Sequence, residues 1–164
     1  MKSNEKPKTE SRAQARRSEA KWTKPLMEAG FTIIPSIIFE RQRALGLDAV
    51  DVNVLMQLFV RWWTADNPPY HSLKDIAYRM EVSVSTIQRS LRRMKDAGLI
   101  EIRPRFDDRG QTSNSYHFDG LIKEATPFAE EALADRAKRQ QEEQDRSIRR
   151  RPRSALRVVE PKKP

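Results

Sequence analysis

The sequence predicts a mainly helical α+β fold that ends in a two-stranded β-hairpin and carries disordered or helical basic tails. Three observations predict it. Apolar residues recur at helical spacing up to about residue 97, the period changes to two after Gly98, and positive charge gathers at both ends. With 37% apolar and 34% charged residues among 164, the chain is too polar to be one compact globule throughout. We therefore expect one small domain between polar tails.

The first predicted elements lead into a central helix. Phe31-Thr-Ile-Ile alternates weakly and predicts a short strand, and a helix follows from Ser36 to about Leu45, where Gly46 ends it. Asp48 is the expected cap of a longer helix that ends before Asn67-Pro68-Pro69. Its apolar positions cover more than half of its circumference, so it should be the buried central helix: Leu47, Val50, Val54, Leu55, Leu58, Phe59 and Trp62.

Two shorter helices and a hairpin are expected next. Ser72 begins a helix of about two turns that buries Leu73, Ile76, Ala77 and Met80. After a break at 81–83, a second helix begins at Ser83 and stops at Gly98, with a core stripe of Val84, Ile87, Leu91 and Met94. Ile100 and Ile102, then Tyr116 and Phe118, alternate with polar residues around the loop 107–114. That order is a helix-turn-helix followed by a wing.

The net charge of +9 and the pI of about 10.1 are unevenly distributed. Residues 1–24 carry +5, residues 83–105 carry +4 and residues 135–164 carry +6, whereas the remainder is acidic. Such clusters select polyanionic partners. The tails have too few apolar residues to fold alone, although Ser11 to Lys21 favours helix. We expect a disordered basic arm (1–24), a DNA-binding domain (25–122), a charged helix from about Pro127 (123–150) and a basic tail (151–164).

Several function classes are excluded by residue content. Without cysteine there is no disulfide framework, thiolate zinc site or cysteine nucleophile. His71 and His117 are too few for a convincing zinc site or catalytic pair, and no phosphate-binding glycine loop occurs, so we expect no enzyme, metal or cofactor. The longest apolar stretch, 52–63, is too short for a membrane span, and the N-terminus is no secretory signal. A soluble, cytoplasmic, nucleoid-associated protein is the expectation.

The span from Leu73 to Ile100 resembles a winged helix-turn-helix, with its Ala77, Val82-Ser83, Thr86-Ile87 and Ala97-Gly98-Leu99-Ile100 positions well filled. Residues 31–118 are similar to the bacterial modules found in phage and plasmid replication proteins and in small transcriptional regulators. One departure is Glu81, which stands at a turn position usually given to glycine, so the turn must place a side chain at a sterically costly positive φ or adopt a longer variant.

The resemblance implies that the helix at about 83–97 enters the major groove of double-stranded DNA. Gln88 and Arg89 are the predicted base readers, because glutamine pairs with adenine and arginine with guanine. Ser83, Ser85 and Thr86 suit phosphate at the helix N-terminus, Arg92 suits bases or backbone, and Arg93 suits phosphate or solvent. On the wing at 99–118, Arg103, Arg105 and Arg109 can reach the DNA backbone. Arg109, which stands beside Gly110, could also enter a minor groove.

The arginines and the aromatic residues each have a simpler structural interpretation. A helix face with three arginines is usually only solvated, but here it coincides with a wing, a glycine stop and basic tails, which favours DNA binding. Trp62, Trp63 and Tyr70 at helical spacing beside Phe59 indicate core more than a stacking platform for single strands.

The main functional hypothesis is a sequence-selective DNA-binding transcriptional regulator. The alternatives are a replication initiator or accessory protein and a non-selective architectural nucleic-acid binder. A homodimer, or a partner protein from replication or transcription, stays open.

Overall fold

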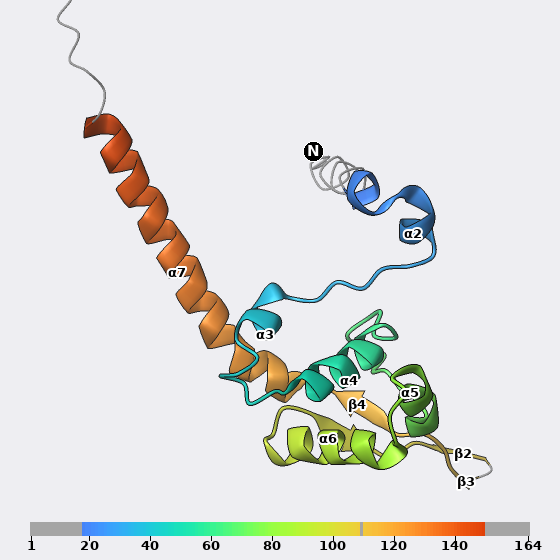
Figure 1. Ribbon diagram of the computed structural model, residues 1–164. Helices are drawn as coiled ribbons and strands as arrows, with labels where there is room; N and C mark the ends of the chain where they lie inside the picture. Colours follow the sequence, from blue (N-terminus) through green and yellow to red (C-terminus); the bar gives the residue numbers. More distant parts are fainter. Residues whose placement is uncertain (1–17, 109, 150–164) are drawn as a thin grey trace, which may run out of the picture. The chain divides into compact units, whose positions relative to one another are not determined.

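The computed structural model describes residues 18–108 and 110–149 (Figure 1). Its contacts divide the chain into two units, 1–125 and 126–164, and each is described by itself. The domain boundaries expected from the sequence stay predictions. The first unit holds five labelled helices and four strands, in the order α2 (Lys24–Glu28), α3 (Ser36–Glu40), α4 (Ala49–Phe59), α5 (Leu73–Arg79), α6 (Val84–Asp96), β1 (Glu101–Arg103), β2 (Phe106–Asp107), β3 (Gly110–Gln111) and β4 (Ser115–His117), before α7 (Asp119–Arg149) begins.

The helix α4 is the buried centre of the first unit, as predicted. Asp48 caps it in a reciprocal box: its carboxylate accepts from the backbone N–H of Asp51 at 2.8 Å, and that of Asp51 accepts from the N–H of Asp48 at 3.1 Å. Val54 and Leu58 are completely buried. The helix ends at Phe59, earlier than expected, because the next turn tightens, with Trp62 N–H donating to the Phe59 carbonyl.

The predicted helix-turn-helix is formed by α5 and α6. Ser72 caps α5 and Ser83 caps α6, each through its side-chain hydroxyl. The turn has Glu81 at φ 53°, which confirms that a residue with a side chain occupies the left-handed position usually given to glycine. The N–H of Val82 donates to the carbonyl of Ala77 at 3.0 Å, the bond that closes a Schellman motif, so the helix ends as a glycine-terminated one would.

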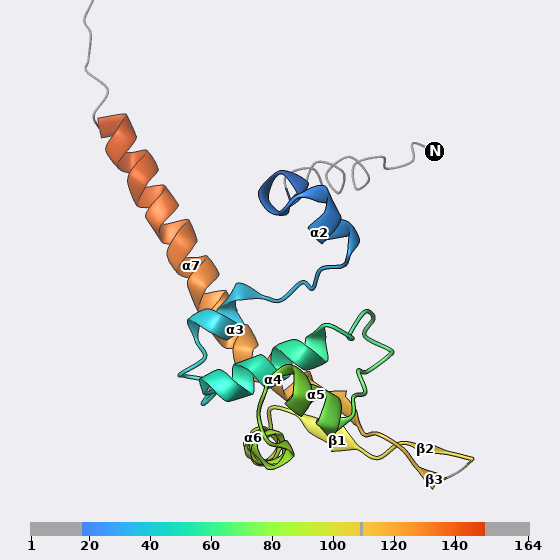
Figure 2. The same ribbon diagram turned by 45° about the vertical axis from the view of Figure 1, so that its right-hand side comes forward.

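The wing consists of two successive antiparallel ladders. β1 pairs with β4 at its base, with Ile102 opposite Tyr116, and β2 pairs with β3 further out, with Phe106 opposite Gln111. In both views the β2–β3 ribbon projects beyond the helices (Figures 1 and 2). Tyr116 and Phe118 are buried, as predicted, and burial raises the pKa of Tyr116 to about 12. The wing base therefore belongs to the core and its outer part does not.

The strand predicted at Phe31 to Ile34 is wrong. These residues pair with no strand in the part of the chain that the structure describes, and the side chain of Ile33 is 86% exposed. The free edge of β4 is taken instead by the loop before α5, because Tyr70 bridges to Ser115 and the N–H of Tyr116 donates to the carbonyl of Pro69 at 3.0 Å. The edge of β4 that faces away from β1 is therefore closed to the segment 31–34.

Three helix boundaries also differ from the sequence prediction. The helix from Ser36 ends at Glu40 and continues only as turns to Gly46, which adopts φ 70°. The C-terminal helix begins at Asp119 instead of Pro127, which lies inside it, since the N–H of Leu121 donates to the carbonyl of Leu99 and Leu121 is buried. The helix favoured from Ser11 to Lys21 is present over 18–22, and residues 11–17 lie outside the described part.

Candidate nucleic-acid interface

The start of α6 carries a cluster of three hydroxyls. The Oγ of Ser83 accepts from the N–H of Thr86 at 3.1 Å and lies 2.8 Å from both the Oγ of Ser85 and the Oγ1 of Thr86. Ser83 and Ser85 are exposed, and Thr86 is half-buried. The predicted phosphate-binding residues thus lie together at a helix N-terminus, where hydroxyl groups and the first N–H groups suit an anion.

The predicted base readers lie on the exposed face of the same helix. Gln88, Arg89 and Arg92 are exposed, whereas Ile87, Leu91 and Met94 on the opposite side are buried. Within residues 18–108 and 110–149, none of these three polar side chains has a hydrogen bond or ion pair with another group of the protein. The exposed face therefore presents one amide and two guanidinium groups that are available to a partner.

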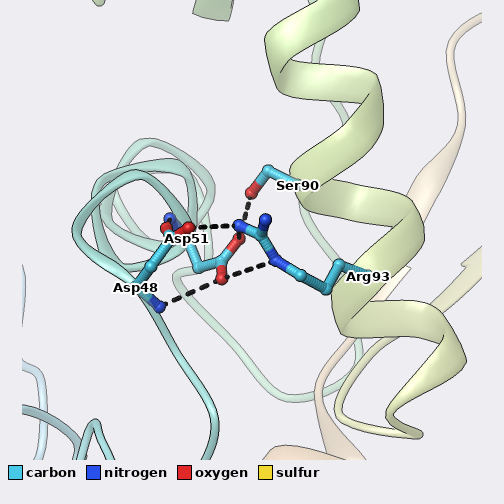
Figure 3. A network of polar contacts seen from close by, with 4 residues as sticks. All are labelled: Asp48, Asp51, Ser90 and Arg93. Carbon is cyan, nitrogen blue, oxygen red and sulfur yellow. Dashed lines mark hydrogen bonds and ion pairs between the residues drawn. The ribbon is translucent and has the colours of Figure 1, made fainter.

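Arg93, predicted as a phosphate or solvent contact, points toward α4 instead (Figure 3). Its Nη2 donates to Asp51 Oδ1 at 2.7 Å and to Asp48 Oδ2 at 2.6 Å, and its Nε donates to Asp51 Oδ2 at 3.2 Å. Ser90 Oγ also donates to Asp51 Oδ1, at 2.5 Å. These hydrogen bonds, that to Asp51 first, raise the pKa of Arg93. Since Asp51 also caps α4, one buried carboxylate fixes α6 against α4.

A groove of about 460 Å³ separates α6 from the wing base. The α6 side contributes Gln88, Arg92 and Lys95, and the wing side contributes Asn114. Asp96 is the acidic residue of its lining, and Leu73, Leu91, Ile102 and Tyr116 form its floor and walls. The groove thus places an amide of the wing beside the polar face of α6, an arrangement that sequence reasoning did not find.

The three wing arginines have different surroundings. Arg103 is bound at 2.8 and 2.7 Å to both carboxylate oxygens of Glu101, and this pairing lowers the pKa of Glu101. Arg105 lies over the ring of Tyr70, 3.8 Å from its centroid, which is cation–π geometry. Arg109 lies outside the described residues. Arg103 and Arg105 therefore both lie on the wing, and each already interacts with another side chain of the protein.

The aromatic residues near the end of α4 divide into two groups. Trp62 packs on Phe59 and Phe118, with ring centroids 5.9 and 4.9 Å away, so its predicted core role is confirmed. Trp63 is 71% exposed and Tyr70 is 50% exposed, so the core prediction for these two is wrong. Phe106 on the wing is also 71% exposed. The error arose because helical spacing was assumed up to Trp63, whereas α4 ends at Phe59 and Trp63 lies beyond it.

A second cleft lies beside these rings, and sequence reasoning missed it as well. It has a volume of about 470 Å³ and is lined by Arg61, Trp63, Asn67, Pro68, Tyr70, His71, Ser72, Asp75, Arg79 and Ser113. Its residues are scattered between positions 61 and 113, so no short motif reveals it.

The described residues contain no group of three or more His, Asp or Glu side chains placed to hold a metal ion. Among the helices within 18–108 and 110–149, we find none with the length and apolar character that crossing a membrane requires.

The family of the chain is shown by its match to a family model. The model of the DnaD N-terminal domain matches residues 34–143, about two thirds of the chain. The chain belongs to the DnaD N-terminal domain family. This domain is a non-catalytic part of replication proteins, in agreement with the expectation that the chain is not an enzyme. Of the two classes that the winged-helix resemblance implied, the DnaD family supports replication.

Similar solved structures include three proteins of low sequence identity. A possible transcriptional regulator from Methanosarcina mazei Go1 is 20% identical with a TM-score of 0.39, over 66% of this chain and 85% of that one. YusO from Bacillus subtilis is 16% identical with a TM-score of 0.39, over 90% of this chain and 94% of YusO. The disulfide-formed AbfR is 17% identical with a TM-score of 0.37, over 87% and 93%. A search of curated protein sequences returned no match.

Proposed function

We propose that this DnaD-family chain is a replication initiation or accessory protein that docks on double-stranded DNA through α6 and the wing. The observation that carries the proposal is the exposed row of Gln88, Arg89 and Arg92, which lack partners within the described residues. The row lies on a helix whose other face is anchored through Asp51. A rigid helix with free donors is what selective reading of base edges requires.

In this proposal the residues divide into readers, positioning residues and structural residues. Gln88 and Arg89 contact base edges, and Arg92 contacts bases or backbone. Ser83, Ser85 and Thr86 bind a phosphate at the start of α6. The wing arginines, Arg103, Arg105 and Arg109, contact the DNA backbone. To do so, Arg103 must leave Glu101 or bind it and a phosphate together, and Arg105 must do the same with Tyr70. Arg93 has a structural part, because its guanidinium is committed to Asp51 and Asp48.

The basic tails would add affinity without selectivity. Residues 1–24 and 135–164 carry +5 and +6, and lysine and arginine on phosphates give a salt-dependent, sequence-independent contribution. Their binding weakens as salt rises, whereas base readout persists. The chromosome as substrate would locate the chain in the cytoplasm, at the nucleoid.

Selection from a library of random duplexes at about 150 mM salt tests the proposal, since purely electrostatic binding is already weakened there. We expect a short enriched motif. Arg89→Ala should weaken binding to that motif about 10-fold or more, and binding to unrelated duplexes much less. Arg139→Ala, which removes an exposed arginine of α7, is the control for charge. Equal losses of motif and non-motif binding in the Arg89 variant would show that α6 does not read sequence.

The arrangement of the enriched motif separates the functions. Direct repeats support docking at a replication origin, and inverted half-sites about one helical turn apart support a symmetric dimeric repressor. Retention of duplexes without any enriched motif would mean that the basic tails dominate DNA binding and that the chain is a non-selective architectural binder.

A further inference from the structure

The cleft beside Trp63 is separate from the face proposed to bind duplex DNA. The segment after α4 contributes Arg61 and Trp63, the loop before α5 contributes Tyr70 and His71, and α5 contributes Arg79. Ser113 of the wing loop closes one side, and its neighbour Asn114 lines the groove beside α6. The two surfaces therefore share no lining residue but meet at adjacent positions of one loop.

The charge of the cleft suits an anion. Arg61 and Arg79 have no hydrogen bond or ion pair with groups in the described part of the chain, and Asp75 is the carboxylate in the lining. Between them lies His71, whose pKa is lowered by burial and by the charges of Arg79 and Arg61. The Nε2 of His71 is buried and has no hydrogen-bond partner among the described residues. The cleft lining therefore holds two guanidinium groups against one carboxylate, together with a buried imidazole whose neutral form is favoured.

The same cleft exposes flat aromatic surface. Trp63 is 71% exposed although the adjacent Trp62 packs into the core. Tyr70 is half exposed and is oriented by Arg105 over its ring and by its bridge to Ser115. Aromatic rings that alternate with free arginines are the chemistry that binds single strands, because rings stack on unpaired bases and cations follow the phosphates. A duplex cannot use the rings in this way, since its base faces are already stacked.

We propose that this cleft binds single-stranded nucleic acid, with a phosphate between Arg61 and Arg79 and a base stacked on Trp63. The site holds about one nucleotide and its flanking phosphate, given its volume of about 470 Å³. It is independent of duplex recognition by α6, so either proposal can fail without the other.

The test measures binding of the full chain to a fluorescent dT 12-mer by anisotropy at about 150 mM salt, where the contribution of the tails is reduced. We expect Trp63→Ala, and separately Arg79→Ala, to raise the Kd about 10-fold, as the loss of one stacked base or one phosphate contact does. Trp63→Phe should retain most of the affinity because it keeps a ring. Trp22→Ala is the matched aromatic control, since Trp22 is an exposed tryptophan outside the cleft. Arg43→Ala is the matched charge control, since Arg43 is an exposed arginine outside the cleft and outside both basic tails.

The same variants measured on duplex DNA complete the test. Trp63→Ala should leave duplex binding unchanged, and Arg89→Ala should leave binding of the dT 12-mer unchanged. A rU 12-mer distinguishes the source of the strand: equal affinity means that any single strand is accepted, and a preference identifies DNA or RNA. Unchanged dT binding in the Trp63 variant would overturn the proposal, and so would equal losses in Trp22→Ala, because they would assign the binding to residues outside the cleft.

Discussion

Replacing Arg93 by alanine tests whether the network of Figure 3 holds α6 in place. The carboxylate side chain of Asp51 is 1% exposed and would lose two of its hydrogen bonds, at 2.7 and 3.2 Å. It would keep the hydroxyl of Ser90 and the N–H of Asp48. The variant therefore leaves a buried negative charge with neutral donors only.

The loss of stability expected for Arg93→Ala depends on how exposed Arg93 and its two partners are. Breaking a fully buried ion pair costs about 3 to 5 kcal/mol. Here the side chain of Arg93 is 51% exposed, so water can replace part of it, and its bond to the half-exposed Asp48 contributes at most about 1 kcal/mol. We expect Arg93→Ala to lower the free energy of unfolding by about 2 to 3 kcal/mol, and the Tm by about 8 to 20 °C for a domain of this size.

Urea denaturation followed by circular dichroism and by tryptophan fluorescence measures this loss. Combination with Asp51→Asn isolates the interaction, because removing Arg93 should then cost about 1 kcal/mol or less. Arg92→Ala, the neighbouring arginine on the exposed face, is the control and should change stability by less than about 0.5 kcal/mol. If Arg93→Ala and Arg92→Ala cost the same, the network does not anchor α6.

Three further predictions concern stability and use the same denaturation assay. Gly120→Ala should cost about 3 kcal/mol, because an added Cβ would lie 1.8 Å from the backbone oxygen of Gly98. Glu81→Gly should stabilise by about 0.5 to 1 kcal/mol, and Gly98→Ala should destabilise by about 1 kcal/mol, since both positions have positive φ; changes of the same sign would contradict the turn geometry. Burial, with the charges of Arg79 and Arg61, lowers the pKa of His71 below its ordinary value of 6.5, so the unfolded chain binds more protons below pH 6.5 and stability should fall from pH 7.5 to 5.5. His71→Gln should flatten this slope, and His117→Gln, which keeps His71, should not.

Much of the fold could be predicted because its determinants are local. The cap at Asp48, the stop at Gly98 and the left-handed Glu81 each depend on a few neighbouring residues, and all three are found in the structure. The apolar stripe of α6 is equally local. The wrong elements depend on distant partners: a strand at 31–34 needs a partner strand, and at the outer edge of β4 that place is taken by Tyr70.

In the candidate site, too, local features could be predicted from the sequence and contacts between distant residues could not. Exposure of Gln88, Arg89 and Arg92 could be deduced from helical periodicity, which fixes the face that a residue occupies. Periodicity could not show that Arg93 reaches Asp51, 42 positions away in the sequence. Nor could it show that Arg61, Arg79 and His71 line one cleft, because residues so far apart in the sequence come together only in the folded chain.

The separation of roles around α6 has a consequence for how this protein can change. Ser90 and Arg93 attach α6 to α4, whereas the side chains at positions 88, 89 and 92 have no hydrogen bond or ion pair with the described residues. The outer positions are therefore free to vary without a penalty in stability. In the proposed mode of binding, exchanging these three side chains should change the DNA sequence that the protein prefers while its free energy of unfolding stays the same.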